Sequence, residues 1–314
     1  MHQLSRTIFP AYFPDAYLDK QSGIETRLVI GTAGIGGAER PISSGEALDV
    51  LLTALSEGVS AFDTAPAHGD AEKYLGKAIA RWRGAPPFIS TKVGRLAGKD
   101  GGNIQYDYSA AGMRQSLLQS LENLGMERIP LLFLHDPAEV PAPDREQVWD
   151  ILLSFREEGL VGGIGLAGNL DSHWRSFLKK GNVDVLMEHG NLDAVNLSAL
   201  HGTVPICLRE NIARFQASPL HYGLLGSGFR AYSKASPEGV SKTESDRAAR
   251  LSTIGRKYDI PFDQLALRFM LSMNEVNRMV VSVANVRELS SCIEAWKAGS
   301  LPQARFYEIC NGLI

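Results

Sequence analysis

Three polar residues each end a short segment that the sequence predicts to be a buried strand. They are Asp63, Lys92 and His135, and His68 follows Asp63 after only four residues. A carboxylate, an amine and two imidazoles can together hold, donate and accept protons. Core packing does not explain polar side chains at successive strand ends. We therefore expect an acid–base site built from these four residues.

The segment around Asp63 predicts how such a site is positioned. An apolar run ends at Asp63, the chain breaks at Pro66 and Gly69, and helical periodicity begins at Asp70. This order is typical of a strand, a loop and a helix. In α/β proteins, ligands bind at the carboxyl ends of the strands. His68 would then lie in a loop beside the other three side chains.

From Arg27 onward, a short apolar segment, a break with Gly or Pro and an amphipathic helix recur along the chain. This pattern predicts eight strands, at 27–31, 59–62, 87–91, 129–134, 161–166, 183–187, 213–217 and 278–283. Eight strand–helix units are the count of a closed parallel barrel. No shift in composition marks a boundary, so we expect one (β/α)8 TIM-barrel domain over residues 1–314.

Helices are predicted where apolar residues recur at intervals of three and four. Besides the helix from Asp70, they cover 44–57, 109–124, 144–158, 171–180, 243–258, 261–273 and 286–298. The stretch 191–209 should hold a helix whose bounds the pattern does not fix. Residues 1–25 are expected to cap the amino end of the barrel. The connection 220–243 is rich in Gly and Ser and could fold over a bound ligand.

The composition is that of an ordinary soluble protein with a net charge of −3. This charge gives no reason to expect a nucleic acid or an anionic membrane as partner. Cys207, Cys292 and Cys310 are odd in number and unpaired in spacing, which fits a reducing cytoplasm and makes a disulfide unlikely on chemical grounds. No apolar run reaches the roughly 18 residues that span a bilayer. We expect a monomer or a small homo-oligomer with a small-molecule substrate.

The segment around Asp63 resembles the signature of the aldo-keto reductase family, in which Phe-Asp-Thr-Ala precedes Tyr-Gly, an acidic residue and Leu-Gly. The matching residues are Phe62, Asp63, Thr64, Ala65, Gly69, Glu72, Leu75 and Gly76. The segments 90–95 and 135–137 extend the resemblance toward the branch with L-fucose, D-threo-aldose and pyridoxal 4-dehydrogenases. One position departs from the pattern, because His68 stands where the family has its catalytic tyrosine.

The resemblance implies an NAD(P)-dependent oxidoreductase that moves a hydride between nicotinamide and a small aldose, polyol or aldehyde. In the family's mechanism Asp63 would pair with Lys92, and His135 would orient the substrate oxygen. With His68, the proton-transfer group changes from a pKa of about 10 to one of about 6.5, and a protonated Lys92 would favour neutral imidazole. A neutral imidazole is a better base than acid. We therefore expect oxidation of an alcohol or hemiacetal to be favoured over carbonyl reduction.

The resemblance also implies which residues contact the dinucleotide, either NAD or NADP. The loop after the seventh strand would lie against the pyrophosphate, and Asn169 and Glu188 would meet the carboxamide. At the adenosine end a basic residue typical of NADP-preferring members is replaced by Ala284, although Arg287 could supply one. The whole set is Gly31, Thr32, Ala33, Asn169, Glu188, Ser218, Pro219, Leu220, Gly223, Leu225, Ser282, Ala284, Asn285, Arg287 and Glu288.

Other interpretations stay open. Without the tyrosine, the chain could be a catalytically impaired protein that binds the cofactor and regulates. The side chains Asp63, His68, His135, Glu188 and His189 are types that hold a divalent metal, as in a metal-dependent isomerase or hydrolase. Lys92 would then be an unpaired cation beside the metal. Schiff-base chemistry at Lys92 is opposed by Asp63, which should keep the amine charged.

Tyrosines near the strand ends are a further open point. Tyr106 and Tyr108 follow the third strand, and Tyr222 follows the seventh. Each could reach the rim of the barrel. They could replace the missing phenol or pack against the wall of the pocket.

Overall fold

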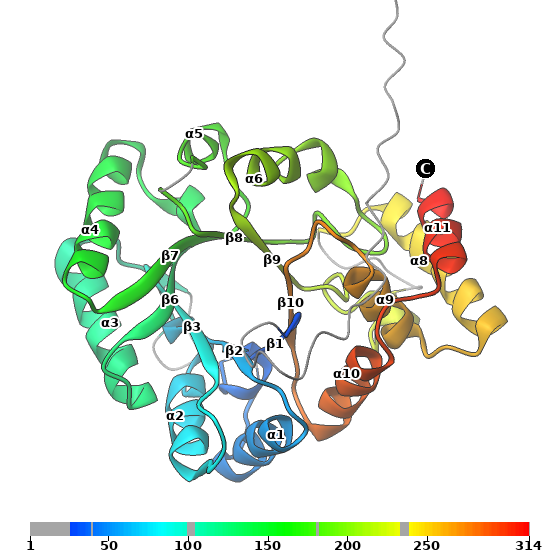
Figure 1. The fold of residues 1–314 in the computed structure, drawn as a ribbon, viewed down its shortest axis with the longest axis horizontal. Helices are drawn as coiled ribbons and strands as arrows, with labels where there is room; N and C mark the ends of the chain where they lie inside the picture. The colour runs from blue at the N-terminus through cyan, green and yellow to red at the C-terminus, as the bar shows by residue number, and fades with distance from the viewer. Residues whose placement is uncertain (1–25, 39, 99–103, 180–181, 233–238, 314) are drawn as a thin grey trace, which may run out of the picture.

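The computed structural model describes residues 26–38, 40–98, 104–179, 182–232 and 239–313. Eight parallel strands form a closed ring in the order β1-β10-β9-β8-β7-β6-β3-β2, and helices surround it (Figure 1). The strands are β1 (Leu28–Gly31), β2 (Ala61–Asp63), β3 (Phe88–Val93), β6 (Ile129–His135), β7 (Val161–Ala167), β8 (Val185–His189), β9 (Ala213–Ala217) and β10 (Arg278–Ser282). The predicted (β/α)8 barrel is confirmed.

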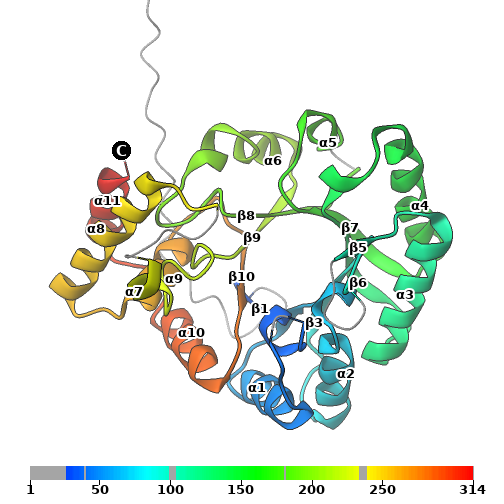
Figure 2. The ribbon, with the colours of Figure 1, turned by 180° about the vertical axis from the view of Figure 1, so that it is seen from behind.

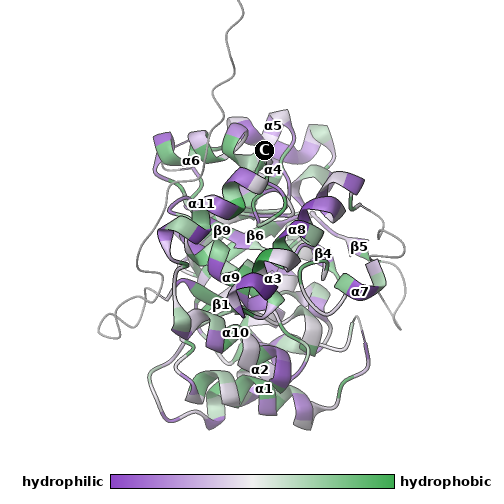
Figure 3. Ribbon diagram, turned by 90° about the vertical axis from the view of Figure 1, so that its right-hand side faces the viewer, coloured by the Kyte–Doolittle hydropathy of each residue, from purple (hydrophilic) through white to green (hydrophobic). Residues whose placement is uncertain are grey.

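The outer layer consists of helices whose apolar faces turn toward the strands. They are α1 (Ser44–Ser56), α2 (Ala71–Arg81), α3 (Ala110–Leu124), α4 (Arg145–Glu157), α5 (Ser172–Ser176), α6 (Val204–Glu210), α7 (Phe229–Tyr232), α8 (Lys242–Tyr258), α9 (Phe262–Leu271), α10 (Val286–Ala298) and α11 (Gln303–Gly312). Figure 3 shows both hydrophilic and hydrophobic residues along these ribbons. Ser43 and Ser241 begin α1 and α8 with capping boxes. None of the described helices has the length and apolarity needed to cross a membrane.

Two parts of the outer layer differ from the sequence prediction. The helix expected over 171–180 ends at Ser176, because Phe177 and Leu178 leave the helix to become buried in the core. A short antiparallel pair, β4 (Arg95–Leu96) and β5 (Gln105–Tyr106), follows β3 and was not predicted. In the side view, this pair of strands and α7 lie toward the same end of the barrel (Figure 3). Both β5 and α7 are labelled in the view from behind (Figure 2).

Two segments that the sequence singled out are not fully described. Residues 1–25, expected to cap the amino end, lie outside the described residues. In the connection 220–243, the structure describes α7 and its flanks but not residues 233–238.

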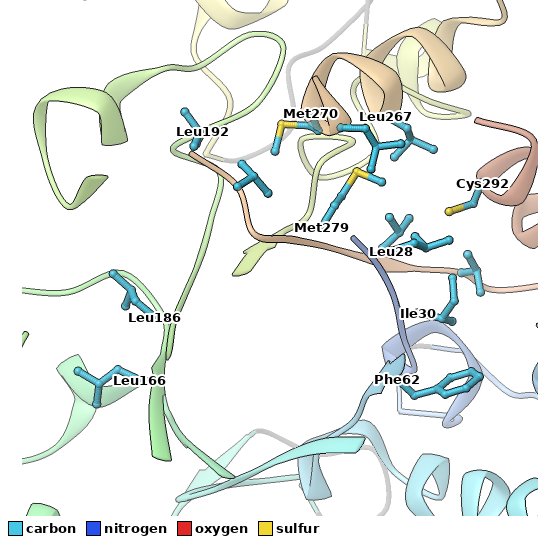
Figure 4. Close-up of a cluster of buried hydrophobic side chains, with 14 of the residues drawn as sticks. Leu28, Ile30, Phe62, Leu166, Leu186, Leu192, Leu267, Met270, Met279 and Cys292 are labelled. Carbon is cyan, nitrogen blue, oxygen red and sulfur yellow. The ribbon is translucent and has the colours of Figure 1, made fainter. Parts of the chain in front are cut away.

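Side chains alternate between the inside of the barrel and the helix layer, as the two-residue repeat of a strand requires. The inner cluster contains Val29, Ala61, Leu131, Phe133, Ala167, Val185, Met187, Phe215 and Val280. The outer cluster is much larger, and Figure 4 shows Leu28, Ile30 and Met279 among its members, with Met270 from α9 and Cys292 from α10. The residues of the inner cluster show which strand positions point into the barrel. By the same alternation, a polar residue at the end of a strand points either into the barrel or toward the helix layer.

The buried Arg27 lies just before β1 and ties the first strand of the barrel to the segment that precedes the last strand, β10. Its guanidinium donates hydrogen bonds to the carbonyls of Leu271 at 2.7 Å and Met273 at 2.5 Å, and also to that of Val276. These carbonyls belong to the last residue of α9 and to the segment just after it, where a helix leaves acceptors without intrahelical partners. Burial lowers the pKa of Arg27 to about 10, while Glu275 acts in the opposite direction. The first strand is therefore tied to the connection that leads into the last.

Glu72 and Gly76 of α2 hold this helix against its neighbours. The buried Glu72 accepts hydrogen bonds from Thr91 of β3 at 2.6 Å and from Asn123 of α3 at 3.3 Å. Burial raises the pKa of Glu72, and these hydrogen bonds oppose the rise. A Cβ atom at Gly76 would lie 2.1 Å from the carbonyl oxygen of Asn123. The close approach of α2 and α3 therefore requires glycine at this position.

Gly76→Ala is expected to lower the free energy of unfolding by about 1–3 kcal/mol, because the new methyl group overpacks against backbone atoms that have little room to move. The matched control is Gly45→Ala in α1, whose added Cβ would have only Ser43 Oγ nearby, at 3.8 Å. This second change should stabilise the protein by about 0.5–1 kcal/mol through helix propensity. Urea unfolding of both variants measures the difference. Equal stability of the two variants would contradict the close packing at Gly76.

Candidate active site

Asp63, Lys92 and His135 point into the barrel at the carboxyl end of three adjacent strands. Asp63 lies two residues beyond Ala61, and His135 lies two residues beyond Phe133, and both of these apolar residues belong to the inner cluster. Lys92 pairs in register with Phe133. Since β2, β3 and β6 are neighbours in the ring, their polar ends meet. The convergence of these three side chains, which the sequence predicted, is present in the structure.

Asp63 and Lys92 form a buried ion pair with fixed geometry. Lys92 Nζ lies 2.5 Å from Asp63 Oδ2 and donates a second hydrogen bond, 2.9 Å long, to the carbonyl oxygen of Thr64. Ser90 donates its hydroxyl to Asp63 Oδ1 at 2.8 Å. Both charged side chains are only about 5% exposed. Ser90 lies in the segment 90–95 that carries the family resemblance, but the sequence did not predict it as a member of the site.

The turn that carries His68 is the short 3-10 helix η2 (Pro66–His68), and the loop after β1 packs against it. Gly36 accepts a hydrogen bond from the Asp70 amide at 2.8 Å, and Gly37 bridges to Gly69. A Cβ atom at Gly36 would lie only 1.5 Å from the carbonyl oxygen of His68. Glycine at 36 therefore lets the two loops touch, and this contact sets the position of His68.

The His68 ring has one hydrogen-bond partner among the described residues. Its Nδ1 lies 3.3 Å from the hydroxyl of Thr32, which in turn forms a 2.9 Å hydrogen bond with the hydroxyl of Thr64. Both threonines are fully buried. Burial lowers the pKa of His68 well below its ordinary value of 6.5, and Lys92 and Arg95 lower it further. The sequence predicted the direction of this shift and the part of Lys92, but neither the burial nor Arg95.

His135 is a second neutral imidazole at the rim. Burial lowers its pKa well below 6.5, and the charges of Lys92 and Arg95 act in the same direction, with smaller contributions from His68 and His189. Its Nδ1 is buried without a hydrogen-bond partner among the described residues. A proton on Nδ1 would therefore be stranded, which favours the tautomer with the proton on Nε2. In this form His135 can donate a hydrogen bond from Nε2.

Arg95 and Asp136 form an ion pair beside the two imidazoles. Arg95, at the start of β4, lies 3.0 Å from Asp136 Oδ2, and Tyr106 of β5 donates to the same oxygen at 3.2 Å. Tyr108 donates to the carbonyl oxygens of His135 and Asp136 at 2.8 and 2.9 Å. The β4–β5 ribbon is thereby fastened to the end of β6. It brings a guanidinium close enough to affect both imidazoles.

None of the three candidate tyrosines has the environment of an acidic phenol. Burial and the nearby Asp136 raise the pKa of Tyr106 and Tyr108. Burial, with Asp193 and Glu244, also raises the pKa of Tyr222. The Tyr222 hydroxyl lies 3.0 Å from Nδ1 of His189 at the end of β8. Packing and hydrogen bonding account for all three hydroxyls.

Glu188 does not lie with the rim residues. Its neighbour Met187 belongs to the inner cluster, so alternation turns Glu188 outward, toward α6. There its Oε2 lies 2.9 Å from Arg214 Nη1 and accepts the hydroxyl of Thr203, in a pair only 2–3% exposed. The residues of β8 that share the inner side are Val185, Met187 and His189. The expectation that Glu188 meets a carboxamide at the rim is corrected by this orientation.

The loop after β9, which the resemblance assigned to the pyrophosphate, is held in a compact conformation. Ser218, His221 and Tyr222 all have left-handed backbone angles, with φ of 54°, 47° and 55°. His221 Nδ1 lies 2.7 Å from Asp193 Oδ2, and Nε2 lies 3.6 Å from Glu244. Burial opposes the charged form of His221, but the two carboxylates outweigh it and raise its pKa. Pro219 and Leu225 of this loop are buried.

The remaining residues predicted to contact the cofactor differ in their exposure to solvent. Gly31 and Thr32 are buried, so the Thr32 hydroxyl contacts protein rather than a ligand. The exposed candidates lie at the ends of β7 and β10 and in the first turn of α10: Asn169, Ser282, Asn285, Arg287 and Glu288. Arg40, which sequence reasoning missed, donates to the carbonyl oxygen of Ala284. Exposed amides, a hydroxyl and two guanidiniums along one rim are suited to a dinucleotide and its phosphates.

A metal site has no support in this geometry. Among the described residues, no group of three His, Cys, Asp or Glu side chains is arranged to hold a metal ion. Glu188 faces the helix layer, and Asp63 is already paired with Lys92 and Ser90.

Comparisons with known proteins agree with this arrangement. The family model described as "Aldo/keto reductase family" matches residues 27–311. The D-threo-aldose 1-dehydrogenase of Pseudomonas sp is 28% identical over 306 residues, 90% of this chain and 93% of that protein. The pyridoxal 4-dehydrogenase of Microbacterium luteolum is 26% identical, over 88% and 91% of the two chains.

The fold is also shared with solved structures. The aldo-keto reductase AKR11C1 from Bacillus halodurans superposes with a TM-score of 0.74 at 20% identity, covering 91% of this chain and 92% of that one. The glycerol dehydrogenase AKR11B4 from Gluconobacter oxydans gives the same TM-score at 19% identity, covering 92% and 91%. At these identities the likeness concerns the barrel itself.

Proposed function

The chain belongs to the aldo/keto reductase family and is an oxidoreductase of the type that acts on sugars and aldehydes. We propose that it transfers a hydride between NAD or NADP and a small aldose, polyol or aldehyde, with His68 as the proton-transfer group. The observation that supports this most directly is the buried Asp63–Lys92 pair beside two imidazoles whose pKa values are lowered. Clusters of perturbed titratable groups are typical of catalytic sites.

The residues of the site have different roles toward one substrate oxygen. A bound nicotinamide dinucleotide supplies or accepts the hydride. In the oxidation direction, neutral His68 takes the proton from the substrate hydroxyl, and His135 donates a hydrogen bond from Nε2 to the same oxygen. The ammonium of Lys92 stabilises negative charge that develops there. Asp63 holds Lys92 in place, and Ser90 holds Asp63.

Cofactor choice depends on the residues around the start of α10. Arg287 is exposed in the first turn, and Arg40 approaches from the loop after β1. Either guanidinium could pair with a 2′-phosphate. Glu288, whose carboxylate accepts the Ala284 amide at 2.8 Å, places a negative charge in the same turn and favours a cofactor without that phosphate. Both dinucleotides are therefore proposed as ligands.

The direct test is a turnover assay with both dinucleotides on a panel of aldoses, polyols and aldehydes, followed through nicotinamide absorbance. We expect oxidation of at least one sugar or polyol with NAD or NADP. Fluorescence titration of the reduced dinucleotides on the same protein measures binding separately. Binding without turnover on every substrate would indicate the catalytically impaired, regulatory alternative. Absence of both binding and turnover at millimolar dinucleotide would exclude the proposal.

The pH dependence of the rate should differ between the two directions. Oxidation needs neutral His68, so its kcat/KM should be constant above the pKa of His68 and fall as the pH drops through it. Since that pKa is below 6.5, the fall should occur on the acid side of pH 6.5. Reduction needs the protonated ring and should decline as the pH rises through the same value. The measurement is kcat/KM in both directions between about pH 4.5 and pH 11, so that a limb near pH 10 would also be seen. An oxidation limb with its midpoint near pH 10 would instead indicate a phenol or an amine as the base.

A further inference from the structure

We propose that the ion pair Arg95–Asp136 is a specificity element that binds a substrate hydroxyl other than the reacting one. The site should therefore prefer neutral polyhydroxylated substrates over aldehydes without hydroxyls and over phosphorylated compounds. Arg95 and Asp136 bind substrate in this assignment and take no part in hydride or proton transfer. The reaction itself is the one proposed above, on which the assignment rests.

The ion pair lies between the elements that carry the two imidazoles. Arg95 begins β4, and β4 packs against η2, the turn that contains His68. Asp136 directly follows His135 at the end of β6. The 3.0 Å contact between Arg95 Nη1 and Asp136 Oδ2 joins these two elements. Arg95 adds to burial and to Lys92 in lowering the pKa of both imidazoles, as expected of a cation beside them.

The same pair acts on a third imidazole across the ring. His189 ends β8, and β7 separates this strand from β6. Burial lowers the pKa of His189, Asp136 and Glu188 raise it, and Arg95 lowers it. A pair that is fixed at the end of β6 and acts on β8 lies toward the mouth of the barrel, where a substrate enters.

Each member of the pair keeps one free polar atom. Arg95 Nη2 has no hydrogen-bond partner among the described residues and is not one of the buried unpaired atoms. Asp136 Oδ2 accepts from Arg95 and Tyr106, whereas Oδ1 accepts no hydrogen bond from the described part of the chain. A Cβ atom at Gly168 would lie 3.3 Å from Oδ1, so glycine keeps the space beside this oxygen open. A hydroxyl can both donate and accept, and it matches this free donor and acceptor.

The backbone holds both residues in place before a substrate arrives. Asp136 has a left-handed conformation, with φ of 50°, which residues other than glycine seldom adopt. Its amide donates to the carbonyl of Ala167 at 2.8 Å, and its own carbonyl accepts the Tyr108 hydroxyl at 2.9 Å. A Cβ atom at Gly94 would lie 2.3 Å from the Tyr108 ring, so glycine lets the tyrosine pack just before Arg95. Polar groups that are fixed in advance lose less freedom when they bind.

The charges around the pair favour a neutral substrate over an anion. Asp136 balances Arg95, and Asp63 balances Lys92. Glu139, whose amide donates to the Asp136 carbonyl at 2.9 Å, adds a further carboxylate in the turn that follows. A phosphate would therefore meet no unbalanced cation among these residues, whereas an uncharged hydroxyl can hydrogen-bond to the ion pair without separating it.

The test compares three aldehydes of equal chain length: glyceraldehyde, propanal and glyceraldehyde 3-phosphate. Their reduction by the reduced dinucleotide is followed through nicotinamide absorbance. We expect kcat/KM for glyceraldehyde to exceed that for propanal by about 10- to 100-fold, because a hydrogen bond to a charged group is lost in propanal. Glyceraldehyde 3-phosphate should also be reduced less efficiently than glyceraldehyde. The hydration of each aldehyde in water is the same for every variant and cancels when their ratios are compared.

Two variants separate hydrogen bonding from charge. Arg95→Met/Asp136→Gly removes both side chains, and glycine suits the left-handed backbone at 136. This variant should lower the ratio of glyceraldehyde to propanal by about 10- to 100-fold. Asp136→Asn leaves the guanidinium unbalanced and should raise kcat/KM for the phosphate relative to glyceraldehyde by about 3- to 10-fold. Arg156→Met is the matched control, because Arg156 pairs with Asp184 on the outer side of the barrel and is 33% exposed, against 29% for Arg95.

The ratios isolate substrate binding from proton transfer. Loss of Arg95 alters the pKa of His68 for all three aldehydes alike, so an indirect effect changes every rate and leaves the ratios as they were. A wild-type ratio of glyceraldehyde to propanal near one, a preference for the phosphate, or an unchanged ratio in the double variant would overturn the proposal. The wild-type ratios and Asp136→Asn decide this even if the double variant does not fold.

Failure of the proposed function has a different signature, because none of the three aldehydes would then be reduced. In that case saturation-transfer NMR with glycerol and propan-1-ol on the full chain tests the hydroxyl site alone. Stronger binding of glycerol in the wild type, lost in Arg95→Met/Asp136→Gly and kept in Arg156→Met, would support the site without the reaction. Equal binding of the two alcohols by the wild type would overturn the site as well.

Discussion

His68→Phe is expected to lower kcat by a factor of about 10² to 10⁴ in both directions, the usual contribution of a positioned acid–base group. Phenylalanine has a similar planar ring but can neither accept nor donate a proton. Dinucleotide affinity should be unchanged, because the exposed candidates for cofactor contact lie at the ends of β7 and β10. Turnover assays and fluorescence titration on the same preparation separate the two effects.

The matched control for this variant is His173→Phe on the outer helix α5. The Nε2 atom of His173 is buried without a hydrogen-bond partner among the described residues, so its removal costs no hydrogen bond. This variant should keep wild-type rates. His68→Tyr is the informative counterpart, because a phenol beside Lys92 should favour carbonyl reduction relative to oxidation. Unchanged rates in His68→Phe would remove His68 from the mechanism.

Asp63→Asn is expected to destabilise the protein by about 3–5 kcal/mol, the usual cost of leaving one member of a buried ion pair without its partner. The amide keeps the shape of the carboxylate but not its charge, so Lys92 Nζ keeps only neutral oxygen acceptors, among them the carbonyl of Thr64. Ser90 also loses a charged acceptor. Urea unfolding measures the change, and turnover should fall because Lys92 is no longer fixed.

The double variant Asp63→Asn/Lys92→Met separates charge burial from packing. Removing both charges abolishes the uncompensated ammonium, so the double variant should recover most of the stability lost in Asp63→Asn. Turnover should not recover, since the cation beside the substrate oxygen is gone. A double variant as unstable as the single one would show that the ion pair is not the cause of the destabilisation.

The strands were the most predictable part of the fold, because most of them are short apolar runs bounded by a charged residue, a glycine or a proline. Once eight strands are assigned to a closed ring, the polar residues that end β2, β3 and β6 must meet. The meeting of Asp63, Lys92 and His135 could therefore be predicted from the sequence. His68 followed from the resemblance and from its place in the loop after β2.

Other features of the site depend on information that one sequence does not display. Glu188 is one position away from inward-facing neighbours, and a single step along a strand moves a side chain to the opposite face. Its partner Arg214 lies on the next strand, so the pair is invisible in the local pattern. The sequence predicted no role for Arg95 in the site, because the short β4–β5 ribbon that carries it has no periodicity. The Thr32–Thr64–His68 chain joins two loops whose close approach depends on glycine at position 36.

The pairing of β1 with β10 limits how early the chain can complete its fold during synthesis. Arg27 reaches carbonyls 244 to 249 positions later, and β1 finds one of its two neighbours only in the last strand of the ring. A nascent chain that has not yet passed β10 therefore carries an open strand edge, which is a surface prone to pairing with other chains. The rim can take its final shape only after nearly all of the polypeptide has left the ribosome.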